Sequence, residues 1–187
     1  GTLANANYAI TFVPANLTIT QRPITVTADD QTKVFGSTDP PLTYIVTTGS
    51  LVGSDSLSGA LGRATGEDVG TFEIKQGTVT AGSNYLITFN SANLTITEKS
   101  MTVVVSTDFL KVRFGDYLLA RIGDAIPTTA TYVSKRTLTW SAGPAENCTI
   151  SESGIVKAVS AGFCTVTARV SANGNYLAGS DSTVFLI

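Results

Sequence analysis

The chain has 187 residues and a formal net charge of −2, so it lacks the basic surface that binds nucleic acid or anionic lipid. Apolar residues make up 43% and charged residues 14% of the chain, which is enough for ordinary cores and excludes a disordered tail. There is no histidine, which excludes Ser-His-Asp and Cys-His catalysis and zinc sites built on imidazole.

No apolar run reaches the roughly 20 residues of a membrane helix, and no amino-terminal signal pattern is present. We therefore expect no membrane insertion in this segment. A signal or anchor could still lie elsewhere in a longer parent protein.

The first stretch of the chain occurs twice, at residues 7–20 and, nearly unchanged, at residues 84–97, with starts at Asn7 and Asn84 that are 77 positions apart. Self-similarity of this kind indicates a tandem array. Apolar residues alternate in both copies, which predicts strands with one buried face. The alternating residues are Tyr8, Ile10, Phe12, Leu17 and Ile19 in the first copy, and Tyr85, Ile87, Phe89, Leu94 and Ile96 in the second.

Short connections join the two alternating runs of each copy, so each copy is predicted to form a β-hairpin. Residues 1–20 are therefore expected to be the terminal hairpin of a preceding repeat. An isolated hairpin is marginal in water. It would need to dock on the next domain, pair with a neighbouring molecule, or belong to a longer parent protein.

Residues 21–98 are expected to form the first complete module. Turn segments rich in Gly, Pro, Ser and Asp separate short apolar runs, for example at residues 36–41 and 53–56. No helical periodicity exceeds a turn, which favours an all-β fold. We expect tandem Ig-like β-sandwich modules, with a small β-grasp-like α+β fold as the alternative for the first module.

The motifs of about residues 22–97 resemble the MBG domain. That family occurs as repeats in large bacterial secreted and surface proteins, many of them adhesins or haemagglutinins. Phe72 stands where the family more often has Tyr. The motifs are Lys33-Val34-Phe35-Gly36, Asp39-Pro40, Leu42-Thr43-Tyr44, Gly59-Ala60-Leu61, Arg63, Gly66-Glu67, Val69-Gly70-Thr71-Phe72, Gln76-Gly77-Thr78, Ala81-Gly82-Ser83-Asn84-Tyr85 and Leu94-Thr95-Ile96.

Residues 99–187 form a second module that does not repeat the first. Its motifs resemble bacterial immunoglobulin-like (BIG-type) repeats, and Trp140 is expected to be a large core residue between sheets. These motifs are Leu138-Thr139-Trp140-Ser141, Cys148-Thr149-Ile150-Ser151, Ser153-Gly154-Ile155-Val156, Ala161-Gly162-Phe163-Cys164-Thr165-Val166-Thr167-Ala168 and Gly174-Asn175-Tyr176.

The two cysteines, Cys148 and Cys164, share strand parity with apolar residues, so both sulfurs are expected to point into one core. Two such cysteines are either buried thiols or a disulfide. We expect the disulfide, because small β modules in oxidising compartments contain such pairs. The BIG-type resemblance implies the same pairing. An extracellular or periplasmic location would follow from the bridge.

Calcium is the one cofactor that the sequence leaves as a candidate, because tandem extracellular β modules often bind it through oxygen ligands at their junctions. The chain has no Asp-x-Asp-x-Asp loop. Adjacent acids such as Glu67-Asp68 point to opposite faces of a strand, so they do not indicate a catalytic dyad. The candidate calcium ligands are Asp29, Asp30, Asp39, Asp108, Asp116 and Asp124.

An intramolecular isopeptide bond is a further alternative, with Lys111 and Lys157 as candidates. Three Asn-x-Thr triplets match the N-glycosylation pattern formally, but two of them belong to the repeated stretch, and a bacterial source would leave them unmodified.

The function expected from these observations is a non-enzymatic stalk or spacer in a bacterial cell-surface adhesin, projecting a distal binding region. Its partners would be neighbouring repeats of the same polypeptide. The alternative is that one module, in particular residues 99–187, is itself an adhesive head that binds a host or surface glycan or protein. An aromatic patch in a surface depression would favour that alternative.

Overall fold

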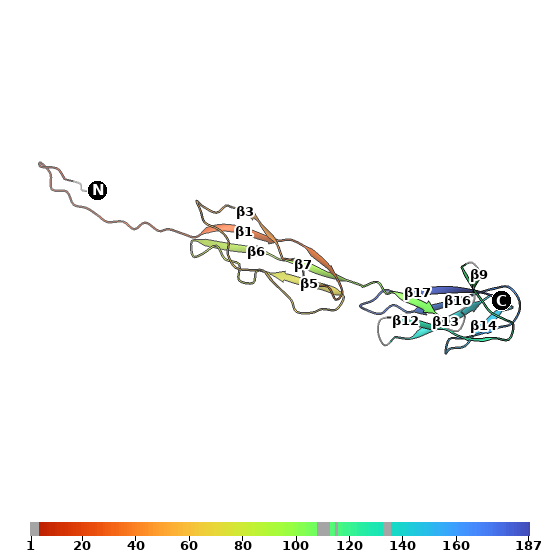
Figure 1. Cartoon of the computed structure of the whole chain (residues 1–187). Coiled ribbons are helices and arrows are strands. Elements are labelled where there is room, and N and C mark those ends of the chain that lie inside the picture. Colours follow the sequence, from red (N-terminus) through yellow and green to blue (C-terminus); the bar gives the residue numbers. More distant parts are fainter. Residues whose placement is uncertain (1–3, 108–112, 115, 133–135) are drawn as a thin grey trace. The chain divides into compact units, whose positions relative to one another are not determined.

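The structure is a computed structural model of the chain and describes residues 4–107, 113–114, 116–132 and 136–187 (Figure 1). Every regular element among these residues is a β-strand, and none of them forms a helix that could cross a membrane. The all-β prediction is confirmed. The α+β alternative for the first module is wrong, because closely spaced turns leave no stretch with helical periodicity.

The chain divides into two compact units. Unit 1 comprises Gly1–Asp29, Leu42–Gly62 and Lys75–Ala92, and unit 2 comprises Asp30–Pro41, Arg63–Ile74 and Asn93–Ile187.

Unit 1 contains a three-stranded sheet in the order β3-β1-β6. Its strands are β1 (Arg22–Ala28), β3 (Tyr44–Thr48) and β6 (Tyr85–Asn90). Strand β1 is antiparallel to β3 and parallel to β6, which lies beside it in Figure 1. Inward-facing Ile24, Val26 and Tyr85 are buried and form the core. Tyr85 also ties down a loop, since its hydroxyl accepts from the Val52 backbone N–H (2.8 Å) and donates to Asp55 Oδ2 (2.7 Å).

A four-stranded sheet has the order β2-β7-β5-β4. Its strands are β2 (Gln31–Val34), β4 (Gly62–Arg63), β5 (Gly70–Lys75) and β7 (Ala92–Thr97). Strands β2 and β7 are parallel and pair Gln31 with Leu94, an offset of 63 residues (94 − 31). The pairing of Arg22 with Tyr85 between β1 and β6 has the same offset (85 − 22). One register therefore governs both parallel pairs.

The predicted hairpin at residues 84–97 is wrong. Only Ser91 separates β6 from β7, yet the two strands belong to different sheets and do not pair with each other. Alternating apolar residues identify a strand but not its partner. Here the partners are β1 and β2, which lie far earlier in the chain.

The first copy of the repeated stretch, residues 7–20, forms no strand. The apolar side chains of this copy are exposed, for example Phe12 at 72% and Leu17 at 88%. The predicted hairpin of residues 1–20 is therefore not found in the part that the structure describes.

The remaining strands of unit 2 form three further sheets, ordered β13-β16-β17-β10-β9, β11-β15-β14 and β12-β8. The strands are β8 (Val103–Ser106), β9 (Arg113–Phe114), β10 (Tyr117–Leu119), β11 (Ala125–Pro127), β12 (Thr129–Tyr132), β13 (Leu138–Gly143), β14 (Cys148–Ile150), β15 (Ile155–Ala158), β16 (Phe163–Val170) and β17 (Gly179–Leu186). Strand β16 alternates buried and outward residues over its whole length. Its inward residues supply a large part of the core.

Paired cysteines test the parallel register of β1 and β6. Asn90 Nδ2 donates to Thr27 Oγ1 over 3.1 Å, so Thr27→Cys combined with Asn90→Cys is expected to form a disulfide. Peptide mapping under non-reducing conditions detects it separately from the native cysteine pair. The matched control, Thr27→Cys with Leu86→Cys, is displaced by four residues, roughly 13 Å along the strand, and should not cross-link. Cross-linking of the control alone would contradict the register.

Candidate functional site

The Cys148–Cys164 disulfide lies in a hydrophobic core of unit 2 and confirms the predicted pairing. Cys148 is on β14 and Cys164 on β16, so the bond joins two different sheets. Both residues are fully buried, with Cα atoms 5.9 Å apart. Trp140 on β13 packs against this core, as the sequence predicts for a large residue between sheets.

Replacing both cysteines measures what the bond contributes. In the chain-entropy model, a loop of this size is worth about 3 kcal/mol of the free energy of unfolding. We expect Cys148→Ala with Cys164→Ala to lower stability by about that amount in denaturant titrations followed by Trp140 fluorescence. The wild-type protein with reductant should behave like the double variant. Equal stability of oxidised and reduced wild type would contradict the prediction.

The main cluster of charged side chains comprises Lys33, Asp39, Arg63 and Glu67. Lys33 points inward from β2, and its side chain is only 4% exposed. Its ammonium contacts Asp39 Oδ1 (2.6 Å) and Glu67 Oε2 (2.5 Å). Arg63 on β4 bonds the same two carboxylates, through Nε to Asp39 Oδ2 (2.5 Å) and through Nη2 to Glu67. Two cations therefore share two anions in a closed ring.

Arg63 also holds the turn that carries Glu67. Its Nη1 donates to the backbone carbonyls of Ala64 (2.9 Å) and Gly66 (2.7 Å), and its guanidinium lies 5.6 Å from the centre of the Phe72 ring. Gly66 has φ +145°, and a Cβ there would lie 2.1 Å from that ring. This close approach explains why a glycine precedes Glu67.

The cluster keeps every member in its charged form. The hydrogen bond from Arg63, followed by that from Lys33, lowers the pKa of Asp39 to about 2. The bonds from Lys33 and then Arg63 also lower the pKa of Glu67, and the bonds to Asp39 and then Glu67 raise the pKa of Lys33. Each charge in the cluster is therefore paired with an opposite charge, and the cluster acts as an ionic lock within the module.

The same charge state opposes the formation of an isopeptide bond within the cluster. Amide formation between Lys33 and Asp39 would require a neutral amine and a protonated acid, and both pKa shifts oppose this. Of the two lysines expected from the sequence, Lys157 is exposed on β15, and Lys111 lies outside the described residues.

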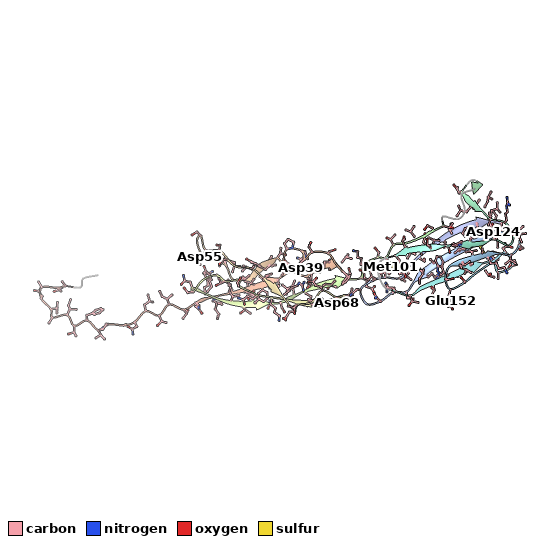
Figure 2. All side chains as sticks on the ribbon, turned by 60° about the horizontal axis from the view of Figure 1, so that its bottom comes forward. Asp39, Asp55, Asp68, Met101, Asp124 and Glu152 are labelled. Atoms are coloured by element: carbon pink, nitrogen blue, oxygen red, sulfur yellow. A yellow bond between two sulfur atoms is a disulfide. The ribbon has the colours of Figure 1, made fainter. Side chains whose placement is uncertain are left out.

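The calcium candidates are not brought together. Asp29 accepts from Thr43 Oγ1 (2.7 Å), Asp30 from the Asn93 N–H (2.7 Å) and Asp124 from the Arg121 N–H (2.9 Å). Asp39 belongs to the ionic cluster, and Asp116 is an exposed turn residue. Asp108 lies outside the described residues. Within the described part of the chain, no three acidic, cysteine or histidine side chains form a group that could hold a metal; Figure 2 labels Asp39 and Asp124.

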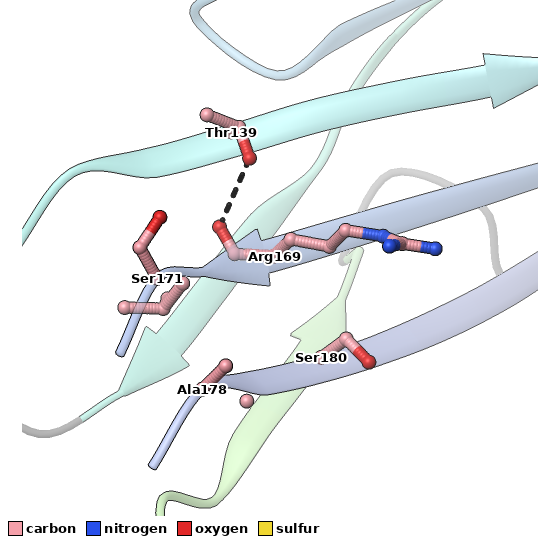
Figure 3. Close-up of a pocket in the computed structure, with 7 residues that line it drawn as sticks. Thr139, Arg169, Ser171, Ala178 and Ser180 are labelled. Carbon is pink, nitrogen blue, oxygen red and sulfur yellow. Dashed lines mark hydrogen bonds between the residues drawn. The ribbon is translucent and has the colours of Figure 1, made fainter. Parts of the chain in front are cut away.

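Three shallow depressions lie on the second module, and two of them include residues of the edge strand β13. The largest, about 610 Å³, is lined by Trp140, Leu138 and Ile150 together with polar Thr137, Thr139, Ser151 and Glu152. A second, of about 300 Å³, is shown in Figure 3, where Thr139 Oγ1 donates to the Arg169 carbonyl (3.2 Å) beside Ser171 and Ser180. A third, of about 280 Å³, includes Arg136, Thr137 and Asn173. Sequence reasoning did not find these depressions, because they depend on which strand lies at the sheet edge.

The comparison with known families identifies the first module. Residues 24–95, which are 72 of the 187 residues, match the MBG domain (YGX type). This agrees with the resemblance stated for residues 22–97. The match includes the four residues of the ionic cluster and most of the two parallel strand pairs. A search of curated proteins finds no match to the chain.

Acid titration tests the ionic lock. The pKa of Asp39 falls from its ordinary 3.8 to about 2 in the folded protein, so its stabilising effect is complete above pH 3.8 and is lost as the pH falls towards 2. We expect Asp39→Asn to have a lower melting temperature at pH 6 and a flatter decline between pH 4 and 2, measured by circular dichroism. Asp116→Asn, at an exposed turn, is the control. Parallel acid profiles for wild type and Asp39→Asn would contradict the lock.

Proposed function

We propose that this chain is a structural spacer segment of a bacterial cell-surface adhesin, projecting a distal binding region. The observation that carries the proposal is the repeated stretch at residues 7–20 and 84–97. In the complete copy it supplies β6 and β7, the closing strands of an MBG-type module. A chain with two such copies is built by repeating a structural unit, as expected for a component that spans a distance between other parts of a protein.

The charged groups of the first module support a structural role. The four members of the ionic cluster neutralise one another and are held in their charged, paired forms. We propose on this ground that the segment is not an enzyme and needs no bound metal. The addition or chelation of calcium is expected to leave its melting temperature unchanged, and a calcium-dependent increase would overturn this part of the proposal.

We propose an extracellular location, on the bacterial surface or in secreted form. Disulfides persist in oxidising compartments, and Cys148–Cys164 joins two sheets of the second module. The MBG domain, which residues 24–95 match, belongs to a family that occurs in large secreted and surface proteins of bacteria. The second module resembles BIG-type repeats, which suits the same setting.

A binding screen tests the spacer role. The whole chain is immobilised and probed with a glycan array and with purified host surface proteins. We expect no selective, saturable binding. Saturable binding that persists at physiological salt would overturn the spacer proposal in favour of an adhesive one.

The second candidate function is an adhesive head at residues 99–187, favoured by the depression beside Trp140. Its volume of about 610 Å³ falls within the range of ligand sites, and it combines an indole with hydroxyls and one carboxylate. Thr137→Ala with Glu152→Gln would separate this function from folding, because Trp140 itself packs in the core. Any glycan binding found in the screen should be lost in this variant if the depression is responsible.

A further inference from the structure

The turn Asn173–Tyr176 is the feature of the second module that the spacer role leaves unexplained. Asn173 and Tyr176 bond each other through both backbone groups, at 3.0 and 2.8 Å. Gly174 and Asn175 lie at the tip of this turn. Asn175 and Tyr176 are nevertheless partly buried, which indicates that something covers them.

The side chain of Asn175 is held at both ends by residues of the MBG-type segment. Its Oδ1 accepts from the Val69 backbone N–H (2.8 Å), and its Nδ2 donates to Asp68 Oδ1 (2.8 Å). Asp68 is labelled in Figure 2. These bonds join positions 106 and 107 residues apart within unit 2. One amide thus satisfies a backbone donor and a carboxylate at the same time, which a randomly placed surface residue would not do.

Tyr176 adds an aromatic contact next to these bonds. Its ring meets Phe35 edge to face, with centroids 5.5 Å apart, and Arg136 lies 5.7 Å from the centre of the same ring. Edge-to-face pairs of this kind are favourable beyond the area they bury. The turn therefore presents one polar and one aromatic group to the segment that contains Phe35, Asp68 and Val69.

The linker takes part in the same arrangement. The Lys99 N–H donates to the Asn175 carbonyl (3.0 Å), the Leu177 N–H donates to the Lys99 carbonyl (3.0 Å), and Lys99 forms a parallel bridge with Tyr176. The first module shows the same pattern, since the Arg22 N–H donates to the Asn84 carbonyl (2.8 Å) and Arg22 pairs in parallel with Tyr85. In both modules, the segment that enters the module makes a backbone hydrogen bond and a parallel pairing with an Asn-Tyr dipeptide.

We propose that the Asn-Tyr pair is a docking element for the Asp68–Val69 bend of an MBG domain, so that a specific contact and not the linker alone connects one module to the one before it. Within this chain the docking element is Asn175-Tyr176. In the equivalent pair of the first module Tyr85 is buried in its own core, and exposed Asn84 alone offers its amide to a preceding MBG domain. The inference deepens the proposed spacer role and rests on it for its purpose, because a spacer holds its direction only if its joints are fixed.

Amide hydrogen exchange of the whole chain tests the proposal at one atom. Val69 N–H exchanges slowly only if Asn175 holds it, so Asn175→Ala is expected to speed its exchange by roughly tenfold. The Ala64 N–H, which bonds to the Glu73 carbonyl (2.9 Å), is an internal reference and should not change. Equal exchange of Val69 in wild type and variant would overturn the proposal.

Two further variants separate docking from general destabilisation. Asn84→Ala removes the matching side chain of the first module and should leave Val69 exchange unchanged; faster exchange there would count against the proposal. Asn175→Asp places a second carboxylate against Asp68 and should also speed exchange. Adding Asp68→Asn reverses donor and acceptor and should restore protection, and failure of this rescue would overturn the proposal. None of these exchange measurements depends on the binding screen. The docking proposal and the spacer proposal can therefore be contradicted independently of each other.

Discussion

The parallel pairing of β1 with β6 and of β2 with β7 is the constraint on which the first module depends. Both pairs use one offset of 63 residues. Parallel neighbours need a long connection, and here that connection contains β3, β4, β5 and the turns that carry Asp39 and Glu67. The residues of the ionic cluster therefore all lie in the segment between the first and last strands of the module.

The ionic cluster shows how a nearly buried lysine is tolerated in a small β module. An unpaired ammonium at Lys33 would be costly because its side chain is almost fully removed from water. Two carboxylates neutralise it, and both remain partly exposed, so their own desolvation is limited. Arg63 then balances the second negative charge and fixes the turn through Ala64 and Gly66. The result is a locally ordered turn whose four charges are balanced.

Those features of the structure that depend on the local sequence pattern could be predicted. Strand parity placed Cys148 and Cys164 in one core, the BIG-type resemblance placed Trp140 between the sheets, and the structure confirms the disulfide. The partners of β6 and β7 could not be predicted, because alternation specifies a buried face and not a neighbour. The pairing of Asp39 and Glu67 with Lys33 and Arg63 could not be predicted, because only the fold brings these cations to them. Asp39 was expected among calcium ligands, and Glu67 was considered only as part of a catalytic dyad. The role of Asn175 could not be predicted either, because its partner Val69 lies 106 residues away and only the fold brings the two together.

The parallel arrangement also determines how the module would respond to tension. The chain enters the module at the start of β1 and leaves it at the end of β7. A stretching force therefore draws β1 and β2 towards their amino ends and β6 and β7 towards their carboxyl ends. Within each parallel pair this is a shearing load, which all the interstrand hydrogen bonds resist together, whereas an antiparallel hairpin opens one bond at a time. A module pulled at these two ends is therefore loaded along its parallel strands, the direction in which its interstrand hydrogen bonds act together.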